Sequence, residues 1–166
     1  RGSGRASGRE TFARVASGAI AKKILSDLGI KIIAYTLKLA DIGINEIDYS
    51  VIDTNSIRCP DKNAALEMEK YILQLKKEKD SVGGIVQIEI EGVPEGLGDP
   101  VFYKLDARLA LALMSLGSVK GFEVGSGFEI TKLKGSQAND PIDEKGFISN
   151  HCGGILGGIS TGEKIT

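Results

Sequence analysis

The sequence has few of the residues from which small proteins often build metal sites and crosslinks. It contains no tryptophan, one histidine, four prolines and two cysteines in 166 residues. Two cysteines cannot form a disulfide scaffold or a four-ligand zinc site, and one histidine cannot hold a metal ion without carboxylates or cysteines around it. The sequence therefore predicts no metal site.

Charge and hydropathy exclude other classes of protein. The 21 basic residues are balanced by 22 acidic ones, and no apolar run reaches the length that crosses a membrane. A net charge of -1 gives no overall positive field that would attract nucleic acid or an anionic membrane surface. Because no signal-peptide pattern is present either, we expect a cytoplasmic protein that binds neither nucleic acid nor membrane.

Glycine, by contrast, is abundant, with 22 residues in the chain. This is roughly 13% of the sequence, where ordinary proteins use about 7%. Eight of the glycines gather in two stretches, near the start and near the end of the chain: Gly2, Gly4 and Gly8, and Gly153, Gly154, Gly157, Gly158 and Gly162. Since glycine lets a backbone approach a ligand closely, both stretches are candidate ligand loops. The alternative for the second stretch is a flexible tail.

Hydrophobic periodicity predicts three helices and three strands. The helices are expected from about Ser7 to Gly29, from Pro60 to Asp80 and over 103–116, and the strands over 30–39, 86–90 and 119–130. Short helical turns are expected between 40 and 60 and a polar loop over 131–148. The third helix is apolar almost all round and should be deeply buried. The alternating strand should be buried on the face that carries Val86, Ile88 and Ile90. This pattern predicts an α+β fold with helices on an antiparallel sheet.

The segment GRASGRE at 4–10 is the strongest candidate for an anion site. It combines a glycine-rich turn with the start of the first helix, where Ser7 would be the N-cap and Glu10 its capping-box partner. Free N–H groups and the guanidinium groups of Arg5 and Arg9 would favour a phosphate or carboxylate, and a helix that had already begun would point both arginines at one anion. The alternative is that both arginines are solvated charges.

Other segments carry weaker signals. The stretch GGILGGISTGEK resembles a phosphate-binding P-loop, but Glu163 stands where that loop needs lysine. Gly117 follows the third helix and is expected to be its C-cap. For His151 a hydrogen-bonded structural role is favoured over acid–base chemistry. The acidic residues Asp140, Asp143 and Glu144 are interpreted as a solvated loop.

Three long stretches together resemble the chorismate synthase family. In order, they read RGSGRASGRETFARVASGAIAKKIL, GVPEGLGDPVFYKLDARLALALMSLGSVKGFEVGSGF and SNHCGGILGGISTGE. The resemblance extends to RCPD at 58–61 and KGSQANDPI at 134–142. Ordered agreement over so much of the chain is far more specific than one short motif.

The resemblance implies an enzyme that eliminates phosphate from 5-enolpyruvylshikimate 3-phosphate to give chorismate, with reduced FMN as cofactor. It implies a homotetramer whose fold is a sandwich of helices and antiparallel β-sheets, and residues 1–166 would form the central part of a single domain. The two catalytic histidines of the family would lie before Arg1, and its flavin-binding Lys-Pro-Thr-Ser segment beyond Thr166. No catalytic residue falls in this chain, which we expect to be inactive by itself.

Position by position, the family's flavin contacts fall on three segments of this chain. These contacts are Arg5, Ala6 and Ser7, then Gly117 and Ser118, and Gly157. Many relatives have Asn-Ala where this chain has Gly117-Ser118, so a contact at 117 would be made by the backbone. Arg9 falls where the family has an arginine expected to bind the phosphorylated substrate. The alternative from another class is a non-catalytic module that binds phosphate or a nucleotide.

Overall fold

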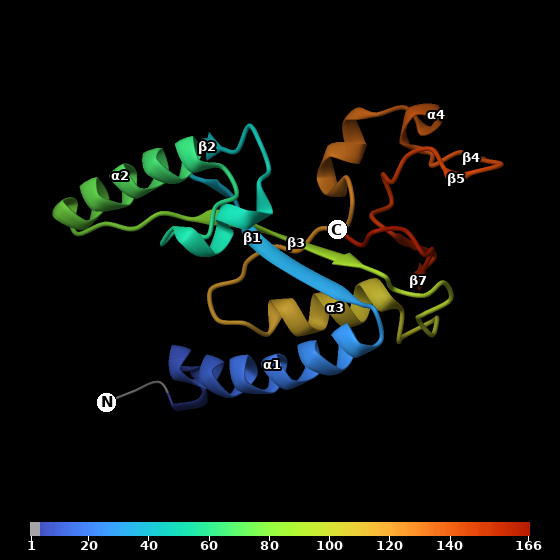
Figure 1. The fold of residues 1–166 in the computed structure, drawn as a ribbon, viewed down its shortest axis with the longest axis horizontal. Coiled ribbons are helices and arrows are strands. Elements are labelled where there is room, and N and C mark those ends of the chain that lie inside the picture. Colours follow the sequence, from blue (N-terminus) through green and yellow to red (C-terminus); the bar gives the residue numbers. More distant parts are fainter. Residues whose placement is uncertain (1–3) are drawn as a thin grey trace. The chain divides into compact units, whose positions relative to one another are not determined.

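The computed structural model describes residues 4–166 and divides into two compact units (Figure 1). Unit 2 is the continuous segment Ile33–Ile88. Unit 1 combines the residues up to Ile32 with Glu89–Thr166. Helices and antiparallel strand pairs occur together in the chain, as the α+β prediction requires.

Most of a three-stranded sheet lies in unit 2, with a helix packed beside it. The sheet has the order β2-β1-β3, formed by Ile42–Gly43, Lys31–Leu39 and Gly84–Glu91. The pairing of β1 with β2 is antiparallel, with Leu39 opposite Ile42. The strand predicted over 30–39 is therefore confirmed as β1. A 3₁₀ helix, η3 at Tyr49–Thr54, supplies the helical turns expected between 40 and 60.

The helix of unit 2 is α2, Lys62–Glu78, and its apolar face forms the core of the unit. Met68 is fully buried and packs with Cys59, Ala64 and Ala65. Partly buried side chains complete this core: Leu39, Ile42, Ile44 and Ile57. The predicted second helix and its inward face are thus confirmed.

Asp61 fixes the start of α2. One carboxylate oxygen accepts hydrogen bonds from the backbone N–H groups of Asn63 and Ala64 at 2.9 and 3.1 Å, and the other accepts from Asn45 at 2.9 Å. The bonds from Asn63 and Ala64 satisfy N–H groups that a helix start leaves without a partner. The bond from Asn45, followed by the other backbone bonds, holds the pKa of Asp61 below its usual value.

The burial predicted for the alternating strand, β3, is wrong at two positions. Val86 is 64% exposed, whereas Glu89 on the opposite face is only 5% exposed. Glu89 can be buried because its carboxylate is paired with the Lys164 ammonium at 2.9 Å. Alternation identified the strand but assigned its buried face on hydrophobicity alone, and it did not reveal the ion pair that allows Glu89 to be buried.

Unit 1 begins with two 3₁₀ turns and a long helix. The turns are η1, Gly4–Ala6, and η2, Gly8–Glu10, and helix α1 follows over Thr11–Asp27. The α-helix therefore begins later than the predicted start near Ser7. No residue of α1 is buried, and its large apolar side chains are mostly exposed: Phe12, Val15, Ile20 and Ile24.

The third predicted helix is present as α3, Leu105–Met114, but the prediction of deep burial is wrong. None of its residues is buried among the described residues, and Leu111 is 66% exposed. The apolar residues of a helix indicate that another segment can cover it, but they do not identify that segment. The described residues simply do not enclose α3.

The strand predicted over 119–130 is also wrong, because the chain forms turns and the 3₁₀ helix η4, Gly127–Lys132. Gly125 and Gly127 both have positive φ angles, at 59° and 49°, which a strand does not allow. The side chain of Glu123 lies over Gly127 and accepts a hydrogen bond from the Phe128 N–H at 3.3 Å. The β-branched and aromatic residues favoured a strand, but the glycines decide the conformation.

The rest of unit 1 consists of short elements. The helix α4 spans Gly135–Ala138, strands β4 and β5 pair over Ile142–Asp143 and Gly146–Phe147, and β6 and β7 pair over Ile155–Leu156 and Ile159–Ser160. The core of this unit combines Val93, Ile155 and Ile165 with Ile30, Ile90, Leu105, Leu109 and Val124. The glycine-rich end of the chain is thus an ordered hairpin that contributes to a core.

Candidate functional site

The three segments predicted to bind a ligand all lie in unit 1. In the segment at 4–10, the Ser7 hydroxyl oxygen accepts the Arg9 N–H at 3.3 Å, and both Arg5 and Arg9 are exposed. The N-cap role of Ser7 is therefore confirmed for the 3₁₀ turn η2, while α1 itself begins after Glu10, which makes no side-chain cap bond. Because Arg5 and Arg9 lie in separate 3₁₀ turns, the α-helical spacing that would point both at one anion does not apply.

The second segment is the turn after α3. Ser115, and not Gly117, is the C-cap of this helix, so the sequence prediction for Gly117 is wrong. Ser118 instead adopts the left-handed conformation, with a φ of 70°. A Cβ atom at Gly117 would have no neighbour within 4 Å, so a ligand can approach its backbone.

A contact ties this turn to the first helix. The guanidinium of Arg14, on α1, donates to the Ser115 hydroxyl at 2.9 Å and to the Ser115 carbonyl at 3.2 Å. Arg14 lies in the first turns of α1, and Ser115 ends α3. This contact joins the end of α1 that follows Arg9 to the end of α3 that precedes Gly117.

The third segment is the turn between β6 and β7. Its glycines differ in what surrounds them. A Cβ atom at Gly153, Gly154 or Gly158 would lie within 3 Å of other atoms, whereas nothing lies within 4 Å of that position at Gly157. Gly157 also has a φ of +62°, which disfavours any side chain. In this hairpin Gly157 is therefore the glycine whose surface is open to a ligand.

The structure places Gly157 away from the other predicted contacts. The carbonyl of its neighbour Gly158 accepts a hydrogen bond from the Leu105 N–H at 2.8 Å, at the first residue of α3. Gly117 follows the other end of that helix. A helix of ten residues rises about 15 Å, so Gly157 and Gly117 lie near opposite ends of α3.

Asp140 was missed at the sequence level, where it was interpreted as part of a solvated loop. Its carboxylate accepts hydrogen bonds from the His151 N–H at 2.6 Å, the Cys152 N–H at 2.8 Å and the Ser149 hydroxyl at 2.7 Å. Burial by itself would raise the pKa of Asp140, but these hydrogen bonds outweigh it and hold the pKa well below its usual value. Nothing in the local sequence distinguished Asp140 from its exposed neighbour Asp143.

His151 has the hydrogen-bonded structural environment that the sequence favoured. Its Nδ1 lies 3.2 Å from the Ser126 hydroxyl, and its carbonyl accepts the Ser126 N–H at 2.8 Å. The next residue, Cys152, is a free thiol whose pKa is raised by burial and by the nearby Asp140. Within residues 4–166, no group of three histidine, cysteine or acidic residues is arranged to hold a metal ion.

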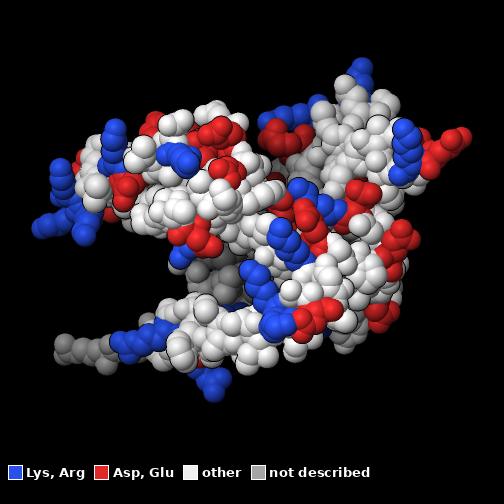
Figure 2. All heavy atoms as spheres, viewed as in Figure 1, with Lys and Arg blue, Asp and Glu red and all other residues white. Residues whose placement is uncertain are grey.

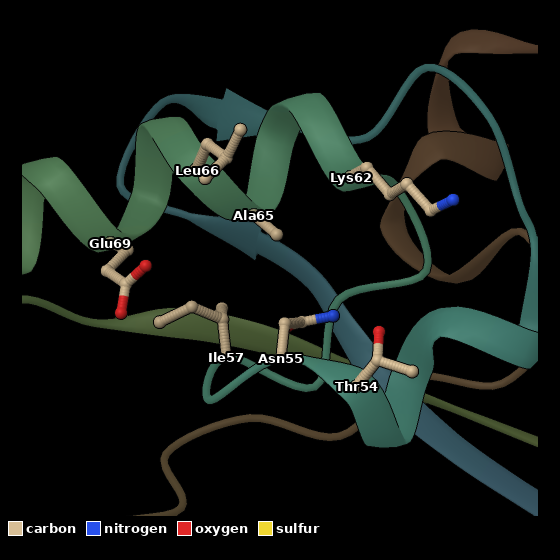
Figure 3. Close-up of a pocket in the computed structure, with 7 residues that line it drawn as sticks. All are labelled: Thr54, Asn55, Ile57, Lys62, Ala65, Leu66 and Glu69. Atoms are coloured by element: carbon tan, nitrogen blue, oxygen red, sulfur yellow. The ribbon is translucent and has the colours of Figure 1, made fainter.

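Each unit contains a hollow. The hollow in unit 2 has a volume of about 270 Å³ and lies between α2 and the segment before it (Figure 3). Ile57, Ala65 and Leu66 give it apolar walls, with Lys62 toward one end and Glu69 toward the other (Figure 3). None of the ligand contacts predicted from the sequence lines this hollow.

The hollow in unit 1 runs along α3 and has a volume of about 320 Å³. Its lining comes from α3 and from the segment that follows it: Lys104, Asp106, Ala107, Ala110, Phe122, Glu123 and Val124. None of the predicted ligand contacts lines it directly, but Lys104 covers Gly158, the neighbour of Gly157.

Charges are distributed without one dominant patch on the face in view (Figure 2). Basic and acidic side chains are scattered among larger uncharged areas, and blue side chains gather at the far end of α2, whose last turn carries Lys76 and Lys77 (Figure 2). None of the helices among residues 4–166 is both long and apolar enough to span a bilayer.

Comparison with known proteins gives one consistent result. The model of the chorismate synthase family matches residues 1–166. Chorismate synthases from Desulfosudis oleivorans and Desulfatibacillum aliphaticivorans are each 52% identical to this chain over 165 residues, which is 99% of the chain but 47% and 46% of the relatives. The relative from Syntrophobacter fumaroxidans is 50% identical over 165 residues.

The fold agrees with the sequence comparison. A crystal structure of chorismate synthase superposes with a TM-score of 0.87 at 35% identity, covering 96% of this chain and 54% of that one. The chain thus spans about half the length of the relatives it matches. From the match over its whole length and the shared fold, the chain belongs to the chorismate synthase family.

Proposed function

We propose that the protein containing this chain is a chorismate synthase. It would eliminate phosphate from 5-enolpyruvylshikimate 3-phosphate to give chorismate, with reduced FMN bound, as a carbon–oxygen lyase of the shikimate pathway. The observation that carries this proposal is the family match over residues 1–166, with relatives 52% identical across 99% of the chain. Residues 1–166 would be the central part of a single domain, in a cytoplasmic homotetramer.

The surroundings of the predicted flavin contacts fit such a cofactor. At Gly117 and at Gly157 the space that a Cβ atom would occupy is free, so part of the cofactor can lie against the backbone at either position. At most neighbouring glycines of the hairpin, other protein atoms occupy the space where a Cβ atom would lie. This close packing fixes the turn that contains Gly157. When bound, reduced FMN supplies an electron that helps the phosphate leave and is recovered afterwards.

Within this chain, the proposed roles are binding and orientation. Arg9 binds the phosphate of the substrate through its guanidinium group, which is exposed and has no ion pair among the described residues. Arg5, Ala6 and Ser7 line the flavin site, with Gly117, Ser118 and Gly157 as the remaining contacts. The groups that transfer protons would be supplied outside residues 1–166, so the chain by itself would be inactive.

The test uses the full-length protein under anaerobic conditions. Reduced FMN and 5-enolpyruvylshikimate 3-phosphate are added, and chorismate is followed by its absorbance. The proposal predicts product only when both are present. A folded protein that binds phosphate or flavin without making chorismate would instead support a non-catalytic binding module.

A further inference from the structure

Arg14 joins two segments that lie 101 residues apart in the chain. One nitrogen of its guanidinium donates to the Ser115 hydroxyl at 2.9 Å, and another donates to the Ser115 carbonyl at 3.2 Å. The Ser115 hydroxyl in turn donates to the Ala112 carbonyl at 2.6 Å, which leaves its oxygen free to accept from Arg14. Because one planar guanidinium makes both bonds, they fix the direction of approach as well as the distance.

Ser115 ends α3 and begins the turn at 115–118, which contains the predicted flavin contacts Gly117 and Ser118. As the C-cap of α3, it lies where helix carbonyls lack partners within the helix and carry partial negative charge, so a cation there is stabilising. Ser118 adopts a φ of 70°, which a residue other than glycine adopts only where its surroundings hold it. The bonds from Arg14 therefore hold the first residue of a turn whose backbone includes a disfavoured conformation.

The start of α1 is also bonded to the turn that carries Arg9. The Thr11 hydroxyl donates to the Gly8 carbonyl, in the 3₁₀ turn η2 that contains Arg9. Arg14 follows Thr11 by about one turn of the same helix. The first turn of α1 is therefore bonded both to η2 and to the turn at 115–118.

We propose that Arg14 is a positioning residue, which contacts neither ligand but sets the place of the turn at 115–118 relative to Arg9. This inference rests on the proposed function, in which Arg9 binds the phosphate of the substrate and Gly117 and Ser118 contact the flavin. A reaction between two bound molecules requires that they be held at a fixed separation and orientation. Without Arg14 the turn loses this connection to α1, so flavin binding should weaken while Arg9 still binds phosphate.

The test is a double-mutant cycle on Arg14 and Ser115 that measures the affinity for flavin. Full-length wild type, Arg14→Met, Ser115→Ala and the double variant are titrated with FMN, and binding is followed by flavin fluorescence. Arg14→Met should raise the Kd of FMN about tenfold, the usual effect of losing hydrogen bonds to a charged group. Ser115→Ala loses one of the two bonds and should raise the Kd about threefold. Because both changes break the same contact, the double variant should match Arg14→Met and not reach about thirtyfold.

Two further variants separate positioning from a general loss of structure or charge. Arg14→Lys keeps a cation that can donate to the Ser115 carbonyl, so its Kd for FMN should be only about threefold above wild type. Lys22→Met is the matched control, because it removes an exposed cation from the same helix, and its Kd for FMN should stay within about twofold of wild type. In Arg14→Met the Kd of the phosphorylated substrate, measured by isothermal titration, should also change by less than about twofold.

Three outcomes would overturn the inference. The first is an unchanged affinity for FMN in Arg14→Met. The second is a double variant in which the two losses multiply, since Arg14 would then act on the flavin independently of Ser115. The third is equal weakening of FMN and substrate in Arg14→Met, which would indicate a general disruption of unit 1. Failure of the wild type to bind FMN would instead count against the proposed function.

Discussion

The helices α1 and α2 each contain 17 residues, but they differ in what covers them and in how they begin. In α2 the apolar face is buried against its own unit, and the Asp61 carboxylate closes the first turn. In α1 no residue is buried, and the turn before it leaves Arg9 exposed. Residues of its own unit cover the apolar face of α2 and cap its first turn. The apolar face of α1 is exposed, and Arg9 before its first turn is exposed too.

This difference separates residues that maintain the fold from residues available for binding. Asp61 and Arg9 stand at comparable positions near the starts of two helices, and both carry a charge. Asp61 is 1% exposed and fully hydrogen-bonded to backbone N–H groups, so it stabilises unit 2. Arg9 has no such partners and is available for a phosphate. Substitutions in the two helices should therefore affect different properties.

The largest effect is expected at the centre of the α2 face. Met68→Ala should lower the free energy of unfolding by about 2–5 kcal/mol, because Met68 is fully buried and its removal leaves a cavity. Denaturant unfolding followed by circular dichroism measures the change. Leu66→Ala, on the same helix but 59% exposed, should cost far less. Equal losses in the two variants would contradict the packing described for unit 2.

Arg9→Ala tests the open start of α1. In the full-length protein, loss of the guanidinium should weaken binding of the phosphorylated substrate about tenfold or more, since a hydrogen bond to a charged group is lost. The Kd of FMN should change by less than about threefold, a small fraction of such a bond. Isothermal titration with each ligand separately makes the comparison. Equal loss of both affinities, or of neither, would refute the assigned role.

Asp61→Asn tests the N-cap of α2, and the loss of stability that it causes should depend on pH. At pH 7 the substitution should cost about 1–2 kcal/mol of stability, as expected for a lost N-cap. The folded state lowers the pKa of Asp61, so its stabilisation is complete above the ordinary value of about 4 and is lost as the pH falls toward the folded value. The difference from wild type should therefore shrink below about pH 4.

Unfolding measured at pH 7 and pH 3 decides this prediction. Asp53→Asn is the control, because the Asp53 side chain is 89% exposed and its ion pair with Arg58 lies at the surface. That variant should lie within about 0.5 kcal/mol of wild type at both pH values. A constant loss in Asp61→Asn across this range would mean that its charge does not stabilise the helix.

The smallest effect is expected on the exposed face of α1. Ile20 is 67% exposed, so Ile20→Ala should change the stability of the 166-residue chain by less than about 0.5 kcal/mol. In the full-length protein the same change should cost about 2 kcal/mol or more if other segments cover this face. Thermal unfolding of both proteins makes the comparison. A negligible cost in both would show that α1 stays uncovered.

The sequence predicted the elements whose signals are local. The second helix was predicted from the spacing of its apolar residues, with a start at Pro60, and the structure has a helix there, Lys62–Glu78. Strand β1 followed from a run of β-branched and aromatic residues. In each case the residues that determine the element are only a few positions apart in the chain, or they form a helix or strand face that is buried within the same unit.

Where distant residues decide, the predictions were wrong. Glu89 is buried because Lys164 pairs with it, 75 residues away in the chain, and Asp140 is hydrogen-bonded by a segment 9 to 12 residues away. Burial of α3 depends on what covers it, which periodicity does not reveal. The candidate site shows the same limit. The sequence predicted Gly117 and Gly157 as flavin contacts, but it did not predict that they lie near opposite ends of α3.

The stoichiometry of the reaction tests the proposed function most directly. The full-length protein is incubated anaerobically with reduced FMN and 5-enolpyruvylshikimate 3-phosphate, and chorismate, inorganic phosphate and the flavin spectrum are followed together. A chorismate synthase should release one phosphate for each chorismate, with the flavin still reduced after many turnovers. Phosphate released without chorismate, or no turnover by a folded protein with FMN bound, would contradict the proposal.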